Sequence, residues 1–352
     1  MAEVRQIEWR ELFEPGGSDA EMRFRVFSKN GAAFLILPHE CRLAARALCL
    51  YPAQGGMARV AKSALRAAFG LGAPVPSGAH ALQIRASDPF IRFLSRLARC
   101  DGPRFAILAG NPRAVGRRFV VLVFGENDEP VAVVKAGAGE EARRLIAHEK
   151  SFLESVPATT PGVPRVRDSL VTDRLDAIAF DFIGGDSPRD TRGLAPLLSS
   201  WVQEELRIPL GGISAFRLLP AGCGGPLSEH VVRPVIYHGD FAPWNVKVSG
   251  RGGTWTALDW ERGELSGVPG WDWFHFTIQP AALVARRNAG GLCRIAEELF
   301  NDPAFLDYAN KTGIAGIVRP LFCAYLVHCI ETVRQTEGSE TLLELLRAFR
   351  ER

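Results

Sequence analysis

The pattern of apolar positions predicts three β-strands and a helix in the middle of the chain. The strands are short runs rich in β-branched and aromatic residues: FAILAG (105–110), RRFVVLVFG (117–125) and PVAVVKAG (130–137). The helix is EEARRLIAHEKSFLESV, in which apolar residues recur at helical spacing until Pro157 ends the run. A small sheet followed by one helix is therefore expected here.

One residue on the apolar face of this helix is charged. Glu149 follows Ala142 by seven residues and precedes Phe152 by three, so it shares their face. A buried carboxylate is costly unless it is paired, so Glu149 needs a cationic partner. Lys135 closes the third strand, but a lysine at a strand end is by itself most simply explained as exposed to solvent.

Residues 1–102 predict an additional region of mixed strands and helices. MRFRVFSKNGAAFLILP alternates apolar and polar residues and then turns at Asn30-Gly31, as a β-hairpin does. DPFIRFLSRLARC begins with the helix-start residues Asp88 and Pro89 and leads into a turn at residues 101–103. We expect this turn to mark a domain boundary.

Between these two segments, GGMARVAKSALRAAFG predicts an amphipathic helix. The apolar face consists of Met57, Val60, Ala61, Ala64 and Leu65, and a basic stripe consists of Arg59, Lys62 and Arg66. The stripe has two interpretations: it binds an anionic partner, such as a phospholipid surface or a sugar nucleotide, or it is a solvated helix face. The sequence alone favours the solvated face.

The residues with the clearest chemistry lie in VIYHGDFAPWNVKV and in TALDWE, which follows it. His238, Asp240 and Asn245 share one loop between two apolar runs, and Asp259 ends the next run. This spacing suits metal-assisted phosphoryl transfer, with one carboxylate to orient a hydroxyl and hard oxygen ligands for magnesium. Taken singly, each residue has a structural explanation in a turn, a cap or a strand end. Their joint spacing favours the catalytic interpretation.

These motifs resemble those of a known family. HGDFAPWN, then LDWE, then GVPGWDWFHF are similar to the aminoglycoside phosphotransferase and choline kinase family, the small-molecule branch of the protein-kinase-like fold. The resemblance covers roughly residues 104 to 335. It implies that Asp240 is the catalytic base and that Asn245 and Asp259 hold the magnesium of MgATP.

The same resemblance assigns roles to four further residues. It implies that Lys135 contacts the α- and β-phosphates of ATP and that Glu149 is its ion-pair partner. Asp272, in WDWFHF, would lie at a helix start behind the catalytic loop in a structural role. His238 is expected to shape the loop rather than to act as an acid or base.

Two features depart from the family pattern, the loop after the first strand and an irregular segment that follows a helix. Gly110 and Gly116 flank a turn that we expect to approach the nucleotide, but AGNPRAVGRRF is not a GxGxxG loop and Pro112 removes a backbone donor. A helix is expected from about Arg192 to Leu206. The following segment, 208–227, is dense in glycine and proline and predicts a loop.

The expected fold is α+β and bilobal, as in protein kinases, with an extra N-terminal region. Residues 1–102 would form an α+β appendage of unknown role. Residues 103–183 would form the ATP-binding lobe with a small antiparallel sheet, and residues 184–352 a mainly helical lobe with the catalytic loop, metal and acceptor sites. At 352 residues the chain is long enough for both lobes and the appendage.

Composition agrees with a globular enzyme, with 47% hydrophobic and 23% charged residues. A net charge of +3 does not indicate nucleic acid binding, and neither a secretory signal nor an integral membrane segment is expected. The seven cysteines show no paired spacing, which favours reduced thiols in a cytoplasmic protein. Cys323, His328 and Cys329 lie in an apolar helical run and are expected to pack in the core rather than bind metal.

The sequence therefore predicts an ATP- and Mg²⁺-dependent phosphotransferase acting on a hydroxyl of a small molecule, such as a sugar, an amino alcohol or an aminoglycoside. Trp260, Trp271 and Trp273 would line such an acceptor site or, as is more usual, pack in the core. Two alternatives remain. The first is a non-catalytic kinase-like nucleotide-binding or scaffold module. The second is a protein kinase, which the lack of an APE segment after Asp259 disfavours.

Overall fold

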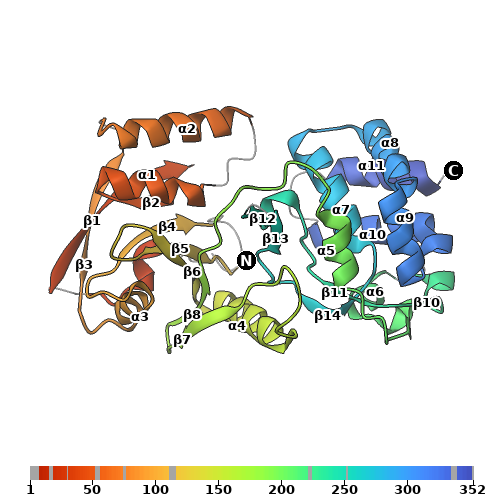
Figure 1. Cartoon of the computed structure of the whole chain (residues 1–352), viewed down its shortest axis with the longest axis horizontal. Coiled ribbons are helices and arrows are strands. Elements are labelled where there is room, and N and C mark those ends of the chain that lie inside the picture. Colours follow the sequence, from red (N-terminus) through yellow and green to blue (C-terminus); the bar gives the residue numbers. More distant parts are fainter. Residues whose placement is uncertain are drawn as a thin grey trace, which may run out of the picture. The chain divides into compact units, whose positions relative to one another are not determined.

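The computed structural model describes residues 8–15, 19–29, 31–51, 56–73, 77–110, 116–220, 224–250, 253–333 and 339–350. The chain divides into two compact units, one of residues 1–154 with 165–183 and one of residues 155–164 with 184–352 (Figure 1). Asn30 of the expected hairpin turn, Pro112 of the glycine-flanked loop and Cys223 lie outside the described residues.

The first unit contains an eight-stranded antiparallel sheet with the order β3-β1-β2-β4-β5-β6-β8-β7 (Figure 1). The strands are β1 (Ala20–Lys29), β2 (Ala32–Pro38), β3 (Gly78–Ile84), β4 (Arg104–Ala109), β5 (Phe119–Phe124), β6 (Pro130–Ala138), β7 (Val166–Val171) and β8 (Leu175–Asp181). The expected hairpin and the three expected central strands are all present. Because β2 pairs with β4, the hairpin continues the same sheet as the strands that follow residue 103.

Helices cover both faces of this sheet. The unit contains a 3₁₀ turn (Trp9–Leu12), α1 (Cys41–Ala47), a second 3₁₀ turn (Leu48–Leu50), α2 (Gly56–Gly70), α3 (Pro89–Ala98) and α4 (Glu140–Ser155). Alternate strand residues face opposite sides, so Phe119 and Val121 pack with α3 while Leu122 and Phe124 pack with α1. Asp88 caps α3 as expected, accepting hydrogen bonds from the backbone N–H groups of Phe90 and Ile91 at 2.8 and 3.0 Å.

The apolar face expected for α2 does not pack against the rest of the unit. Met57 and Val60 are exposed, and Ala61 and Ala64 are exposed with them. The residues of α2 that approach the body are instead Ala58, Lys62, Leu65, Ala68 and Phe69. The predicted helix is present, but α2 has two apolar stripes, and the one named from the sequence, apart from Leu65, faces outward.

The second unit is mainly helical. Its helices are α5 (Leu194–Ser200), α6 (Ser214–Arg217), α7 (Trp271–Gln279), a π-helical turn (Pro280–Val284), α8 (Ala289–Phe300), α9 (Pro303–Thr312), α10 (Val318–Val333) and α11 (Ser339–Arg350). Short antiparallel strand pairs join β9 (Ile208–Pro209) to β10 (Val231–Val232), β11 (Val235–Tyr237) to β14 (Glu264–Gly267), and β12 (Val246–Ser249) to β13 (Thr254–Ala257). A sheet-rich unit and a mainly helical unit confirm the expected α+β fold class.

Two expectations for the second unit have different outcomes. The helix expected from Arg192 to Leu206 is too long, because α5 ends at Ser200. The indole of Trp201 is buried and donates to the backbone oxygen of Pro161 at 2.9 Å, and the chain turns away from the helix there. The segment 208–227 contains only a two-residue strand and single turns of helix, as its glycine and proline content indicates.

The long apolar run of the sequence forms α10, in which Cys329 is buried. Within the described part of the chain, no group of three or more His, Cys, Asp or Glu side chains could hold a metal ion. Among the described helices, none alone has both the length and the apolar composition to cross a membrane; Pro303–Thr312 and Ala315–Glu331 pass that test only as a pair bent by 106°.

Candidate active site

A carboxylate at the start of α7 holds the loop that carries Asp240. Asp272 is buried, and its two oxygens accept hydrogen bonds from the backbone N–H groups of His238 and Gly239 at 2.8 and 3.1 Å. Gly239 has φ of +79°, and a Cβ there would lie 2.7 Å from the Cβ of Arg262, so glycine suits this turn. Asp272 therefore has the structural role that was expected.

His238 connects the loop to the next strand as a neutral ring. Its Nε2 lies 2.8 Å from the backbone oxygen of Leu258, which can only accept, so Nε2 carries the proton. Its Nδ1 then accepts from the backbone N–H of Asp240 at 3.2 Å. Burial lowers the pKa of His238 to about 4, and the ring packs 4.6 Å from that of Trp260. This environment supports the loop-shaping role and not acid–base chemistry.

Each oxygen of Asp240 has one partner within the second unit. Oδ1 lies 3.0 Å from Nε2 of His275, and Oδ2 accepts from Nδ2 of Asn245 at 3.0 Å. Burial raises the pKa of Asp240, but the hydrogen bond and charge of His275 outweigh this effect, so the pKa lies below its usual value. The carboxylate is therefore ionised at neutral pH, and its side chain remains 38% exposed.

The amide of Asn245 is oriented by two acceptors. Its Nδ2 donates to the backbone oxygen of Asp240 at 2.8 Å as well as to Oδ2, which fixes the amide nitrogen on that side. The amide oxygen therefore points away from Asp240 and is a suitable hard ligand. The backbone N–H of Leu258 donates to the backbone oxygen of Asn245 at 2.7 Å, which brings the neighbouring Asp259 toward Asn245.

Asn245 and Asp259 fit a magnesium ion of the kind that binds with a nucleotide. Mg²⁺ prefers oxygen ligands and is usually held by one or two protein groups together with phosphate oxygens and water. Asp259 adopts φ of +69°, an uncommon conformation for a non-glycine residue, directly after the strand pair β12–β13. One amide and one carboxylate oxygen are enough for such a site.

In the first unit, Lys135 and Glu149 form the expected ion pair. Nζ of Lys135 lies 2.6 and 2.8 Å from the two carboxylate oxygens of Glu149. Glu149 is 1% exposed and Lys135 is 13% exposed, so both charges are largely removed from water. Ala142 and Phe152, which the sequence placed on the apolar face of α4 with Glu149, are buried, and Ile146 and Leu153 are buried with them.

The two glycines proposed to approach the nucleotide lie on either side of residues 111–115, which are outside the described part. The backbone N–H of Gly110 donates to the backbone oxygen of Arg118 at 3.3 Å. Gly116 has φ of +71°, and a Cβ there would lie 2.9 Å from side-chain carbons of Glu141 and Leu145. Gly116 is therefore explained by the close approach of α4.

His275 is a site residue that the sequence interpretation did not identify. It lies one helical turn after Asp272 on α7, so the two side chains share a face that contacts the loop. Its Nδ1 lies 3.3 Å from the hydroxyl of Tyr325 on α10, which holds the ring from behind. The spacing Asp-x-x-His in WDWFHF was the available signal.

The three tryptophans considered for an acceptor site are packing residues. Trp260 and Trp271 are fully buried and Trp273 is 4% exposed. Trp260 lies against Trp201 at 5.1 Å between ring centres, and Trp273 lies against Phe305 at 5.3 Å. They do not present a face to a ligand.

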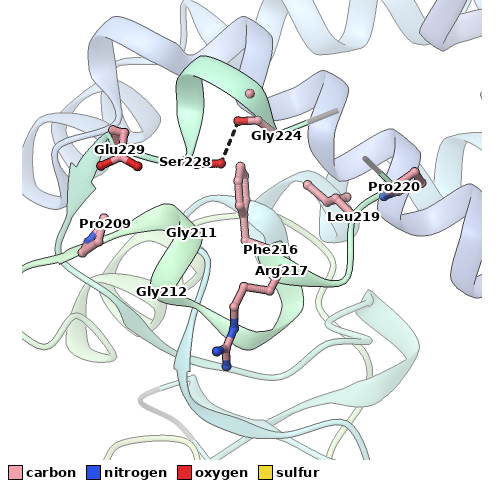
Figure 2. A pocket seen from close by; sticks show the side chains of 11 residues that line it. Pro209, Gly211, Gly212, Phe216, Arg217, Leu219, Pro220, Gly224, Ser228 and Glu229 are labelled. Carbon is pink, nitrogen blue, oxygen red and sulfur yellow. Dashed lines mark hydrogen bonds between the residues drawn. The ribbon is translucent and has the colours of Figure 1, made fainter. Parts of the chain in front are cut away.

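A separate hollow of about 510 Å³ lies in the irregular segment of the second unit. Figure 2 shows the ring of Phe216 between Ser228 and Arg217, with the Ser228 hydroxyl bonded to the backbone oxygen of Gly224. None of the predicted site residues lines this hollow. It therefore adds nothing to the constellation around Asp240.

No family model and no curated protein sequence matches the chain. Solved structures do match. An aminoglycoside phosphotransferase from Streptomyces rimosus shares 13% identity over 59% of this chain and 87% of its own, with a TM-score of 0.37. The chain resembles small-molecule kinases of the protein-kinase-like fold.

A second similar structure is an ethanolamine kinase from Plasmodium vivax. It shares 10% identity over 70% of this chain and 82% of its own, with a TM-score of 0.46. The S. rimosus enzyme has also been solved with ADP and streptomycin.

The neutral state of His238 gives a prediction for stability. The pKa of His238 is about 4 in the folded chain and 6.5 in the unfolded chain, so the unfolded chain binds a proton first as the pH falls. Between pH 6.5 and 4 this residue should remove about 3 kcal/mol of the free energy of unfolding. His238→Asn should therefore be less stable at pH 7 but should lose less stability on acidification.

Denaturant unfolding of both proteins across this pH range measures the difference. The titration of groups present in both proteins cancels when the two pH dependences are compared. One such group is Asp272, whose pKa is raised to about 7 and whose protonation therefore stabilises the folded chain as the pH falls. If the free energy of unfolding changed equally with pH in the wild type and in His238→Asn, His238 would not be the buried neutral group described here.

Proposed function

We propose that the chain transfers the γ-phosphate of MgATP to a hydroxyl group of a small molecule, with Asp240 as the catalytic base. The observation that carries this proposal is the fixed, ionised carboxylate of Asp240. It is held by His275 on one oxygen and Asn245 on the other, beside an outward-facing amide oxygen. This arrangement combines a base and a metal ligand on one short loop, as phosphoryl transfer requires.

Asp240 would accept a hydrogen bond from the acceptor hydroxyl and take its proton as the new P–O bond forms and the bond from the γ-phosphorus to the bridging oxygen breaks, with ADP as the leaving group. Among the described residues, each carboxylate oxygen has one hydrogen-bond partner, so a further lone pair remains for the substrate. Magnesium held by Asn245 and Asp259 would neutralise charge on the phosphate oxygens. The chain's own contribution is positioning and electrostatic stabilisation.

Lys135 would contact the α- and β-phosphates of the nucleotide. Glu149 holds its ammonium group in a fixed place, so little side-chain entropy would be lost on binding. Sugars, amino alcohols and aminoglycosides all carry suitable hydroxyls, so the acceptor is proposed only as a small polyhydroxylated or amino-alcohol molecule. The alternative, a non-catalytic nucleotide-binding module, rests on the departure of residues 110–118 from a GxGxxG loop.

Replacing Asp240 and Asp259 separates catalysis from nucleotide binding. Asp240→Asn should lower the rate of phosphate transfer by about 10²- to 10⁴-fold, because the base is lost, while Mg-dependent ATP affinity is unchanged. Asp259→Ala should abolish the magnesium dependence of ATP binding. Calorimetric titration of ATP with and without magnesium, followed by an ADP-release assay over a panel of sugars, amino alcohols and aminoglycosides, measures both effects.

Asp307→Ala, at an exposed position on α9, is the matched control and should behave as wild type. ATP binding without turnover on any acceptor would support the non-catalytic module. An absence of ATP binding under every magnesium condition would exclude both the phosphotransferase and the non-catalytic nucleotide-binding module.

Lys135 and Glu149 allow stability and nucleotide binding to be distinguished. Lys135→Met removes the cation that contacts a buried carboxylate, which should destabilise the protein by about 3–5 kcal/mol. The double variant Lys135→Met/Glu149→Leu should recover much of this stability but should not recover ATP affinity. Unfolding curves and ATP titrations on both variants give the two readouts. Recovered ATP affinity in the double variant would show that the pair is only structural.

His275 should affect the rate rather than nucleotide binding. His275→Phe removes the donor to Asp240, so kcat should fall by about 10- to 100-fold and ATP affinity should be unchanged. Because the pKa of Asp240 would rise, the acid limb of the kcat profile should move to higher pH. His275→Gln, which keeps a donor, should recover part of the rate. An unshifted acid limb in His275→Phe would refute this role.

A further inference from the structure

A surface of the first unit combines positive charge with exposed apolar side chains. Residues 41–87 contain six arginines and lysines and no aspartate or glutamate. Five of the six lie on α1 and α2, namely Arg42, Arg46, Arg59, Lys62 and Arg66. These helices lie side by side, with α2 on the outer side of α1 (Figure 1). The positive charge is therefore gathered on one part of the surface.

A hollow of about 560 Å³ lies between the two helices and is lined by Arg42, Arg46 and Arg66. Arg46 pairs with Glu129 at 2.7 Å. Arg42 lies 3.9 Å from Asp128. Because Arg104 also contacts Asp128, this carboxylate balances the charge of Arg42 only in part. Among the described residues, Arg66 has no acidic partner. The hollow therefore carries net positive charge.

The outward side of α2 is apolar. Met57 is 90% exposed, Val60 is 69% exposed and Leu71, directly after the helix, is 85% exposed. On a helix, Met57, Val60, Ala64 and Leu71 fall on one side, and Ala61 lies beside them. The side chains of Leu65 and Phe69 point instead toward the body of the unit. The apolar stripe has no covering element among the described residues.

We propose that α1 and α2 dock on an anionic lipid surface. The stripe of Met57, Val60, Ala64 and Leu71 enters the boundary between headgroups and acyl chains, and Arg66, on the flank of α2 that lines the hollow, contacts lipid phosphates. The 15-residue helix, about 22 Å long, suits a helix that lies in the interface plane. This proposal does not depend on the phosphotransferase activity.

Charge decides between lipid and a second copy of the chain. In a symmetric dimer the same patch lies on both sides of the contact, so the interface would contain the positive charge of both copies and no acidic residue of segment 41–87 to balance it. Like charges at such a contact are unfavourable, whereas an anionic bilayer is complementary to both parts of the surface. A free phosphate would use the arginines but would leave the apolar stripe in water.

Sedimentation with vesicles tests the proposal on the full-length chain. One set of vesicles contains phosphatidylcholine alone, and the other contains phosphatidylcholine and phosphatidylglycerol in equal amounts. The wild type should sediment with the anionic vesicles and not with the neutral ones. Val60→Glu should weaken this binding by about tenfold or more, because a charge replaces an inserted valine. Arg66→Gln should weaken it about fivefold, and raised salt should weaken it further.

Matched controls exist in the same unit. Val171 on β7 is 67% exposed, similar to Val60, and Arg23 on β1 is an exposed arginine. Val171→Glu and Arg23→Gln should bind anionic vesicles as the wild type does. Equal binding to both vesicle types, equal losses in variants and controls, or no vesicle binding at all would each overturn the proposal. So would a wild-type dimer, detected by analytical ultracentrifugation, that Val60→Glu dissociates while vesicle binding stays unchanged.

Discussion

The hydrogen bonds from Asp272 to the backbone of residues 238 and 239 are the constraint on which the candidate site depends. Burial of a charged carboxylate is unfavourable. It raises the pKa of Asp272 to about 7, although the backbone N–H groups of His238 and Gly239 donate hydrogen bonds to it. The two hydrogen bonds fix the conformation of the turn at Gly239, which is the structural consequence of burying Asp272. With that turn fixed, His238 can bond Leu258, and Leu258 can bond Asn245. The positions of Asp240, Asn245 and Asp259 follow from this sequence of contacts.

The electrostatics around Asp240 favour orientation over strong basicity. A carboxylate whose pKa lies below the usual value is a weak proton acceptor, so it would not remove the hydroxyl proton early in a reaction. In a loose phosphoryl-transfer transition state the nucleophile needs little deprotonation before it attacks. His275 and Asn245 therefore suit a base that aligns the acceptor and takes its proton late. This agreement between the local environment and the proposed chemistry does not depend on the identity of the acceptor.

The sequence predicted those features that leave a local periodic signal. Runs of β-branched and aromatic residues in 117–125 and 130–137 predicted β5 and β6, and a charged residue on the apolar face of α4 indicated the Lys135–Glu149 pair. The motif spacing predicted that Asp240, Asn245 and Asp259 belong to one site, and the structure shows the hydrogen bond between Asp240 and Asn245. His275 was missed because its contact with Asp240 joins two elements 35 residues apart, and no periodicity records such a contact. The end of α5 was missed because burial of Trp201 overrides a helical pattern that continues beyond it.

The exposed stripe of α2 follows from the way the sheet is extended. On one face of the extended sheet, Leu35 and Leu37 of β2 join Leu122 and Phe124 of β5 in a second apolar cluster. Leu43 and Leu48, in and directly after α1, cover that face, and α2 contributes Phe69 with Leu65 beside it. A helix that supplies so few core residues needs only one narrow apolar stripe, yet α2 has two. The outer stripe is therefore not required for folding of this unit, and its position on the same helix as Arg66, which has no acidic partner among the described residues, is what the proposed lipid-binding surface requires.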